Sequence, residues 1–441
     1  MINAGDTAWV LTSSALVLLM TVGLAFFYGG LVRPKSALNT MMMSVVALGL
    51  VSVQWVLLGY SLSFAPGSPW IGGLAWVGLR GVGLEPHPAY GATIPQQAHA
   101  MFQGMFAIIT PALISGAIVE RMRFRSYAVF ILLWATLIYD PLARWVWGQG
   151  GWLATRGAID FAGGTVVHIS AGVSALVAAL VLGPRNDYRR AALIPHNVPL
   201  VLLGAGLLWF GWFGFNAGSA LAANGLAALA LTNTNTAAAT ALVVWALLDI
   251  NRTGRVTAVG AATGAVVGLV GITPAAGYVG PIASIAIGAV CALISYGAMQ
   301  IRSRTSLDDS LDVFSCHGLA GISGALLTGV FAAKAWNPAG ADGVLAGNWS
   351  QLGIQGLAVI VAASFAGLGT FVILKLIEVT IGTRARVQDE LSGLDLTEHG
   401  EEAYFGGDIG SLAGPGVSLG GSVVVLEQRS EPQDLPVPAR A

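Results

Sequence analysis

The chain has 441 residues, of which 55% are hydrophobic and only 10% are charged, and its mean hydropathy is +0.73. A soluble domain carries about 25% charged residues, so this chain lacks the polar side chains that a water-facing surface needs. The formal net charge of −1 and the lack of any basic run give no indication of a nucleic-acid partner. The composition therefore predicts an all-α polytopic membrane protein.

Apolar segments long enough to cross a bilayer follow one another along the chain. A transmembrane helix needs about 20 apolar residues, and charges, prolines and glycine clusters mark its ends. We predict eleven transmembrane helices, near residues 8–32, 39–62, 99–119, 126–143, 162–182, 198–217, 227–248, 257–273, 281–300, 313–333 and 352–377. The first basic residue is Arg33, so no signal peptide is expected and the first segment is retained. The predicted membrane domain covers residues 1–380, and a tail covers residues 381–441.

Lysine and arginine are distributed unevenly over the loops between these segments. One set of alternate loops carries Arg33, Lys35, Arg121, Arg123, Arg125, Arg185, Arg189, Arg190, Arg252, Arg255, Arg302 and Arg304, and the other set carries Arg80, Arg144, Arg156 and Lys334. Because cytoplasmic loops are enriched in basic residues, we expect the first set to be cytoplasmic. The N-terminus is then outside and the tail inside, as an odd number of spans requires.

One polar phrase occurs twice in this apolar chain, as HISAGVSAL from His168 and as HGLAGISGAL from His317. Asp160 and Asp309 each stand eight residues before the histidine. The spacing divides the membrane domain into two five-helix halves, 8–182 and 198–333, followed by an eleventh helix at 352–377. An odd number of helices gives the halves opposite orientations, and such inverted repeats place the substrate path at their interface. We therefore expect the two imidazoles to face each other.

Other roles for these residues remain open on the sequence alone. Each histidine is also compatible with a simple bond to a backbone carbonyl, although ionisable groups in spans usually mark a pathway. A metal site is the weaker alternative, because two histidines lack the further ligands that zinc requires. Cys316 points about 100° away from its neighbour His317 on a helix, so we expect it to pack. Cys291 and Cys316 lack CxxC spacing, and we expect no disulfide, metal or cofactor.

Longer motifs dispersed along residues 7–405 resemble the Amt/MEP ammonium transporter family. They are FFYGGLVRPKSALN, FAIITPALISGAIVERMRF, DFAGGTVVHISAG, GWFGFNAGS, DVFSCHGLAGISGALLTGVFA and GLDLTEHGEEAY. The resemblance implies a homotrimer in the lipid of the cell membrane, with one pore for ammonium or ammonia in each eleven-helix subunit. The tail resembles the family's docking segment, which implies a PII-type signalling protein as a cytoplasmic partner. We expect the tail to be disordered after about residue 410.

The resemblance also implies roles for individual residues. These are an outer recruitment site of Phe106, Trp147 and Ser219, a gate of Phe106 and Phe215, pore histidines His168 and His317, and an acid near the mouth, Asp160, which organises the site. Aromatic faces attract a small cation by about 0.5–2 kcal/mol, and a serine hydroxyl can accept its hydrogen bond. A bare charge crosses an apolar constriction poorly, so ammonium would shed its proton there and K⁺ would be excluded.

Taken singly, most of these residues have ordinary explanations. Phe106 with Phe102 is typical of aromatic packing, Trp147 of an interfacial belt, Asp160 of a helix N-cap and Ser219 of a helix contact. Only their joint match favours a transport site. A Rhesus-like channel for neutral gas and an ammonium sensor remain alternatives. An enzyme is not expected, because no nucleophile motif accompanies the histidines. Whether a proton crosses with ammonia stays open.

Overall fold

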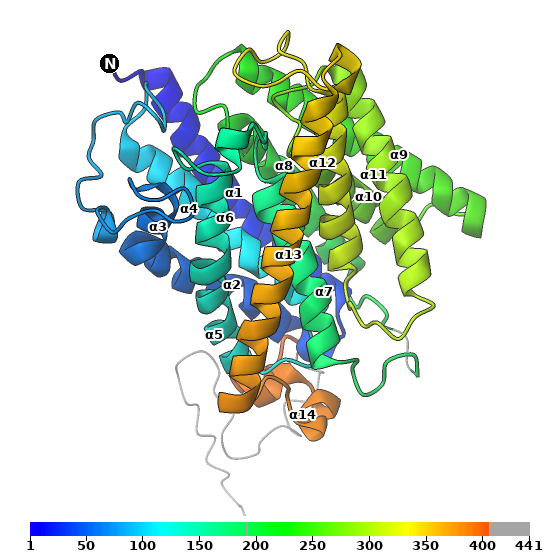
Figure 1. Cartoon of the computed structure of the whole chain (residues 1–441). Helices are drawn as coiled ribbons and strands as arrows, with labels where there is room; N and C mark the ends of the chain where they lie inside the picture. Colours follow the sequence, from blue (N-terminus) through cyan, green and yellow to red (C-terminus); the bar gives the residue numbers. More distant parts are fainter. Residues whose placement is uncertain (191–192, 405–441) are drawn as a thin grey trace, which may run out of the picture.

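The computed structural model describes residues 1–190 and 193–404, and regular structure in these residues is helical apart from isolated β-bridges. The helices form a bundle with the N-terminus at one end and α14 at the other, here called the N-terminal end and the tail end (Figure 1). The long helices are α1 (Ala4–Leu31), α2 (Ala37–Gln54), α4 (Gln96–Ile114), α5 (Phe124–Trp134), α7 (Ser170–Leu182), α8 (Val198–Gly218), α9 (Gly225–Thr253), α10 (Ala258–Ile272), α11 (Pro281–Arg302), α12 (Ala320–Phe331) and α13 (Trp349–Thr380). The short ones are α3 (Tyr60–Phe64), α6 (Asp140–Val146) and α14 (Val387–Ser392).

Ten helical segments in the described residues are long and apolar enough to cross a membrane, and they match ten of the eleven predicted spans. The chain is therefore a multi-pass membrane protein. The remaining predicted span, 257–273, is helix α10, whose 15 residues fall short of the usual length of about 20. Its hydrophobicity reflects burial inside the bundle along most of its length. The count of eleven spans and the orientation of the termini stay predictions.

Four of the spans described by the structure contain a short π-helical turn that the hydrophobic pattern did not reveal. These turns are Trp55–Gly59 between α2 and α3, Ala135–Tyr139 between α5 and α6, Gly164–Ile169 before α7 and Phe314–Leu319 before α12. Such turns widen a helix locally and occur frequently at functional sites. The last two contain His168 and His317, so the repeated phrase of the sequence corresponds to a repeated local structure.

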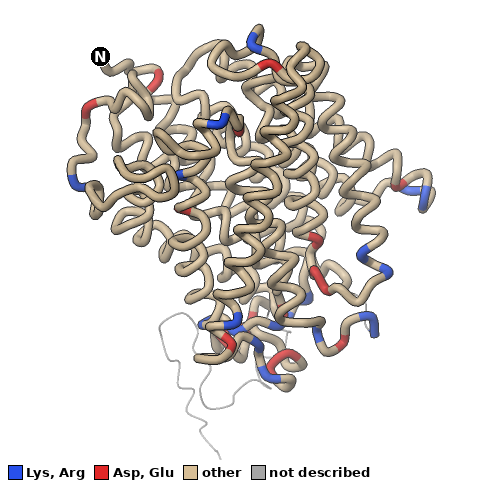
Figure 2. Tube along the Cα trace, in the orientation of Figure 1, with Lys and Arg blue, Asp and Glu red and all other residues tan. Residues whose placement is uncertain are grey.

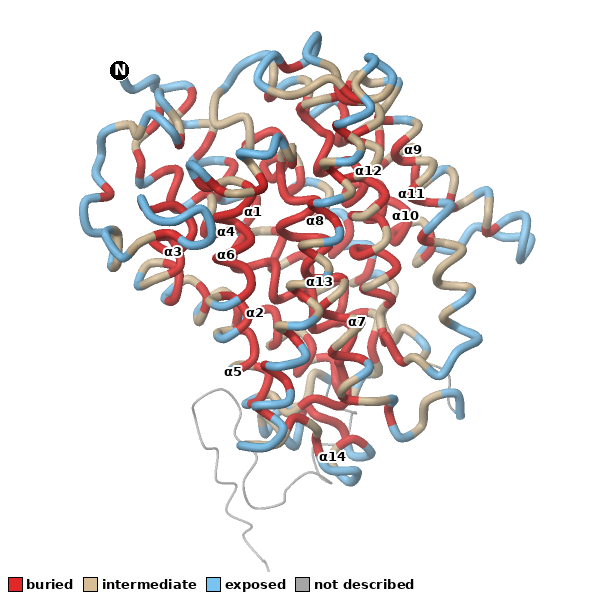
Figure 3. Tube along the Cα trace, in the orientation of Figure 1, coloured by how far each residue is buried: buried red, intermediate tan, exposed pale blue. Residues whose placement is uncertain are grey.

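Helices that are equivalent in the two predicted halves pack against each other. The first helix of one half, α1, lies along the first helix of the other, α8. Their backbones come so close that a Cβ on Gly204 would lie 2.3 Å from the backbone nitrogen of Phe27. Small residues allow this close approach. In lipid, the van der Waals packing that results takes the place of the hydrophobic effect as the driving force for helix association. Figure 3 shows the buried residues concentrated along such contacts inside the bundle.

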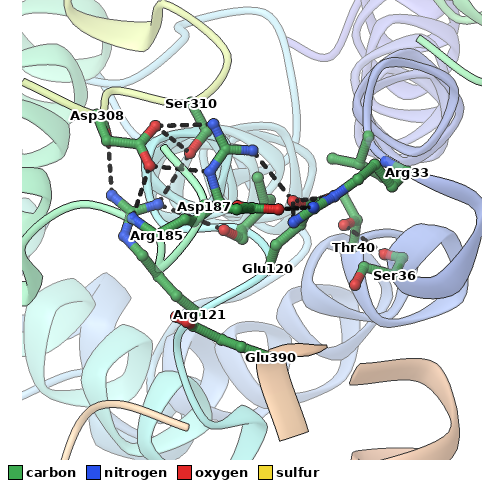
Figure 4. Close-up of polar contacts among 12 residues, drawn as sticks. Arg33, Ser36, Thr40, Glu120, Arg121, Arg185, Asp187, Asp308, Ser310 and Glu390 are labelled. Carbon is green, nitrogen blue, oxygen red and sulfur yellow. Dashed lines mark hydrogen bonds and ion pairs between the residues drawn. The ribbon is translucent and has the colours of Figure 1, made fainter. Parts of the chain in front are cut away.

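Charged residues gather at the tail end, where they join loops from both halves (Figure 2). The tail-end charge cluster consists of Arg33, Glu120, Arg185, Asp187 and Asp308 (Figure 4). Arg185 lies 3.0 Å from Glu120 and 2.8 Å from Asp308, while Arg33 pairs with Glu120 and Asp187. Because Glu120 belongs to one half and Asp308 to the other, these ion pairs fasten the two halves together.

A fully buried arginine, Arg121, reinforces this junction through hydrogen bonds to neutral groups. Arg121 donates to the carbonyl oxygens of Gly183 at 2.9 Å and Asp308 at 2.6 Å, and to the hydroxyl of Ser310 at 2.8 Å. The planar guanidinium has five donors in a fixed arrangement, which suits several carbonyl groups at once. It therefore fixes the geometry of three loops together.

The described part of the tail lies across the same end of the bundle. The carboxylate of Asp395 accepts hydrogen bonds from the backbone nitrogens of Leu38 (3.0 Å) and Asn39 (2.7 Å) at the start of α2. Glu390 pairs with Arg384 at 2.8 Å. The predicted cytoplasmic tail is thus ordered up to Tyr404 and attached to the membrane domain. The disorder expected after about residue 410 falls outside the described residues.

The charge cluster predicts a loss of stability in acid. Burial raises the pKa of Glu120, but Arg33 and Arg185 outweigh this effect and hold the pKa below its ordinary value. A carboxylate with a lowered pKa stabilises the fold above the unfolded pKa, about 4.3, and this contribution disappears as the pH falls through the folded pKa. Glu120→Ala should lower the free energy of unfolding by about 1.5–3 kcal/mol at pH 7, because Arg33 and Arg185 each keep only one carboxylate partner. Thermal unfolding in detergent at pH 7 and at about pH 3, below the unfolded pKa, measures both effects, with exposed Glu401→Gln as control.

Candidate functional site

Two acidic residues hold the π-turns that carry the histidines. The carboxylate of Asp160 accepts from the backbone nitrogens of Gly163, Gly164, Thr165 and Val166 at 2.7–3.2 Å. Asp309 does the same for Val313 (3.0 Å) and Phe314 (2.8 Å). The first backbone nitrogens of a helix have no partner within it, so each acid satisfies donors that lipid would leave unpaired. The expected capping role of Asp160 therefore has a geometric counterpart at Asp309.

Helix α7, which follows the first π-turn, crosses the second π-turn at glycines, and this crossing brings the histidines together. A Cβ on Gly172 would lie 2.1 Å from the backbone nitrogen of Gly318, so only glycine permits the approach. The Nδ1 atoms of His168 and His317 lie 3.3 Å apart. Both side chains are buried, and the Nε2 atom of His168 has no hydrogen-bond partner among the described residues. The expected facing pair of imidazoles is therefore present in the geometry.

A series of aromatic rings extends from the histidines toward the N-terminal end. Phe215 stacks on Phe106 with centroids 4.1 Å apart, and its centroid is 6.0 Å from that of His168. Trp147 meets Phe106 edge-on at 6.0 Å. The neighbouring Phe102 contacts Phe106 at 5.0 Å. The two rings of the expected gate are thus in direct contact, with Trp147 as the next ring outward.

Trp147 and Ser219 are held by backbone carbonyl groups. The indole Nε1 of Trp147 donates to the carbonyl oxygen of Asp160 at 2.9 Å, and the hydroxyl of Ser219 donates to the carbonyl oxygen of Phe215 at 2.9 Å. Since the hydroxyl proton of Ser219 is used, its oxygen lone pairs remain available to accept a bond from a ligand. This polarity suits a cation that carries protons.

The sequence analysis did not identify Trp212 as a site residue. Its ring stacks on His168 with centroids 5.4 Å apart and planes inclined by 22°. Its Nε1 donates to the hydroxyl of Thr273 at 2.9 Å, which fixes the ring. Trp212, Phe215 and Ser219 stand at i, i+3 and i+7 on α8, the spacing of a single helix face. This spacing could have indicated Trp212 as a site residue, but it does not show that the ring stacks on His168 from another helix.

The space beside the histidines is very small, whereas a wider cavity opens toward the tail end. A cavity of about 10 Å³ adjoins His168, His317, Trp212 and Phe215, which is about the room that one water-sized molecule needs. A second cavity of about 580 Å³ is lined by His317 and reaches the tail-end loops. The space beside the histidines is therefore narrow and mostly apolar.

Ionisable residues line the wider cavity next to His317. Arg302 and Asp312 form an ion pair at 2.5 Å, and burial raises the pKa of Asp312 to about 7 although Arg302 opposes this effect. Cys316 is buried in the core, as expected of a packing residue, and also lines this cavity. In the described residues no cluster of three potential metal ligands occurs.

The described helices form a multi-pass membrane protein. A narrow and largely apolar space lies inside it beside the histidines. A family model described as "Ammonium Transporter Family" matches residues 8–404. The chain belongs to this family. The ammonium transporter of Bacillus subtilis is 49% identical over 401 residues, covering 91% of this chain and 98% of that protein, and the one from Aquifex aeolicus is 48% identical, covering 91% and 94%.

Solved structures share the same fold. The crystal structure of Saccharomyces cerevisiae Mep2 is similar with a TM-score of 0.82 and 36% identity, covering 88% of this chain and 91% of that one. A structure named "Sensor Amt Protein" is similar with a TM-score of 0.82 and 31% identity, covering 90% and 98%. The family expected from the sequence motifs is therefore confirmed.

The capping geometry of Asp160 leads to a stability prediction. Asp160→Ala leaves four buried backbone nitrogens without their acceptor and should lower the free energy of unfolding by at least about 2 kcal/mol, the upper value for ordinary N-caps. Asp160→Asn keeps one acceptor oxygen and should cost less. Thermal unfolding in detergent provides the comparison, with Asp342→Asn in a loop as control. Equal stability of the alanine variant and the parent would contradict the capping role.

Proposed function

We propose that the protein transports ammonium across the cell membrane, releasing a proton near the aromatic gate and conducting ammonia past the twin histidines. The observation that carries the proposal is the 3.3 Å contact between the Nδ1 atoms of His168 and His317, beside a cavity of only about 10 Å³. Relatives at 42–49% identity are named ammonium transporters, and no enzymatic step is proposed. Their names support the substrate, and the geometry supports the route.

Ammonium would first bind at the N-terminal end of the route. There Phe106 and Trp147 offer aromatic faces, which attract a cation by about 0.5–2 kcal/mol, and Ser219 offers a hydroxyl oxygen. The stacked rings of Phe106 and Phe215 then close the path. An ion cannot shed enough of its hydration there, whereas neutral ammonia passes with a far smaller electrostatic cost. In this mechanism K⁺ is rejected because it has no proton to give up.

The histidines would serve ammonia in two ways. A neutral imidazole has one donor and one acceptor nitrogen, so the pair can guide ammonia by hydrogen bonds and pass a proton between the facing Nδ1 atoms. Because each Nδ1 faces the other, only one of them can carry the shared proton while both rings are neutral. We favour a relay in which His168 takes up the proton that ammonium releases, the shared proton moves from His168 Nδ1 to His317 Nδ1, and His317 releases a proton toward the wider cavity. One positive charge then crosses with each ammonia, which makes transport electrogenic; the alternative, Rhesus-like, is flux of neutral gas.

The assembly and the partner follow the family expectation. We propose a homotrimer with a pore in each subunit, an inverted relation between the two halves, the N-terminus outside and the tail in the cytoplasm. The occurrence of a π-turn with a histidine in each half and the pairing of α1 with α8 support the two-half organisation. The basic residues at the tail end support the orientation.

An ammonium sensor is the second candidate, because the "Sensor Amt Protein" shares the fold over 90% of this chain. Growth of a transport-deficient host on low ammonium separates the two functions. Rescue by this protein supports transport. A failure of rescue, with the protein folded and ammonium bound, would favour the sensor.

Replacing the histidines tests the route directly. In proteoliposomes on a solid-supported membrane, His317→Ala should reduce the ammonium-evoked current by about 100-fold or more, since positioned acid–base groups contribute factors of this order. His168→Asp, which places a carboxylate in the pore, should admit K⁺. His87→Gln, a histidine in a loop outside the route, is the control. Full current and full discrimination against K⁺ in both pore variants would refute the proposed role.

Truncation tests the partner. A chain that ends at Ile381 loses Glu390 and Asp395, whose contacts attach the tail to the bundle. It should lose binding of a PII protein, measured by pull-down and by inhibition of transport. A chain that ends at Tyr404 keeps those contacts and should retain binding. Equal binding by both truncated chains would contradict a docking role for the described tail.

A further inference from the structure

An apolar groove on the side of the bundle takes no part in the proposed route. It lies between α7 and α13, encloses about 700 Å³ and is lined by Val177 and Leu180 on one side and Leu368, Phe371 and Lys375 on the other. Figure 1 shows α13 crossing the bundle with α7 beside its tail-end half. The groove therefore faces outward between two membrane-spanning helices.

The shape of the groove follows from a small residue between large ones. Gly367 has no side chain, and a Cβ at this position would already lie 3.3 Å from a methyl group of Val173, so the two helices are close there. On either side of this floor stand Leu180 and Leu368, which are 64% and 69% exposed. In a bilayer such exposed apolar walls face lipid chains.

The length of the groove matches one leaflet. Its lining residues on α13 extend from Ala363 to Lys375, which at 1.5 Å per residue corresponds to about 18 Å along the helix axis. Half of a hydrocarbon core of about 30 Å is about 15 Å. A single acyl chain of the leaflet at the tail end therefore fits along the groove, with its headgroup near Lys375.

One exposed cation, Lys375, stands at the tail-end mouth of the groove. The Lys375 side chain is 46% exposed, and it pairs at 2.6 Å with the similarly exposed Glu378. An exposed pair of this kind contributes at most about 1 kcal/mol, so a phosphate can compete for the lysine. Arg384 donates to the carbonyl oxygen of Leu182 at the end of α7. Arg384 is already paired with the buried Glu390, so the weakly paired Lys375 is the cation offered to a headgroup.

We infer that this groove is a binding site for an anionic phospholipid, with one acyl chain between α7 and α13 and the phosphate at Lys375. Basic pockets between helices on the cytoplasmic side of a membrane recognise anionic headgroups in this way. The site needs no transport activity. It depends only on the bundle and on the tail end facing a leaflet that contains anionic lipid.

The experiment measures lipid preference at the groove itself. Leu368→Cys carries a fluorophore in full-length protein reconstituted into vesicles, where the native Cys291 and Cys316 are buried. Quenching by brominated phosphatidylglycerol and by brominated phosphatidylcholine gives their relative association constant at this position. We expect phosphatidylglycerol to bind about fivefold more strongly, since one basic residue near the surface contributes a factor of this size.

Two substitutions should change this preference in opposite directions. Lys375→Gln should abolish it, whereas Glu378→Gln should increase it because the competing carboxylate is gone. Lys334→Gln, at the N-terminal end, is the matched control and should have no effect. A ratio near one in the parent, or no response to either substitution, would overturn the inference. So would a lack of quenching by both lipids together with a disulfide between two copies of the Leu368→Cys variant, because a second copy would then cover the groove.

Discussion

The crossing of helix α7 with the π-turn Phe314–Leu319, at Gly172 and Gly318, is the contact on which the rest of the site depends. A methyl group at Gly172 would overlap the backbone of the opposite turn, with 2.1 Å between its Cβ and the nitrogen of Gly318. Because the backbones touch, the imidazoles of His168 and His317 are brought to 3.3 Å. The aromatic rings and Trp212 are then arranged around a pair whose separation is fixed by the main chain rather than by flexible side chains.

The π-turns beside this crossing begin with backbone nitrogens that have no partner within the helix, and nearby carboxylates accept their hydrogen bonds. A π-turn that begins inside an apolar bundle exposes backbone nitrogens, and an unpaired group in lipid costs several kcal/mol. Asp160 and Asp309 accept these donors. Beside the small cavity, in contrast, the Nε2 atom of His168 has no partner among the described residues. The carboxylates thus satisfy the backbone of the turns, whereas this imidazole nitrogen is left able to bond to a small ligand.

The repeated phrase around His168 and His317 was sufficient to predict that the two imidazoles face each other, because repetition at a fixed spacing implies symmetry. Ten spans were predictable from length and hydropathy. The eleventh predicted span contains α10, whose 15 residues are mostly buried among other helices, and its crossing of the membrane stays a prediction. The hydrophobic pattern missed the π-turns, since one extra residue per turn leaves a uniformly apolar segment unchanged. Trp212 was missed because its function depends on a ring from another helix and on Thr273, which the spacing within α8 does not reveal.

The tail end connects these local arrangements to the rest of the molecule. Glu120 follows α4, the helix of Phe106, while Asp308 precedes the π-turn of His317, and Arg185 bonds to both. Phe106 and His317 therefore belong to segments whose tail-end residues are both bonded to Arg185. Arg384 and Glu390 extend the same network into the tail. A partner that displaced the tail would act on ion pairs rather than on the pore, and would change the relative position of the two halves through Arg185. In this arrangement the tail is connected to both halves through charges at the tail end.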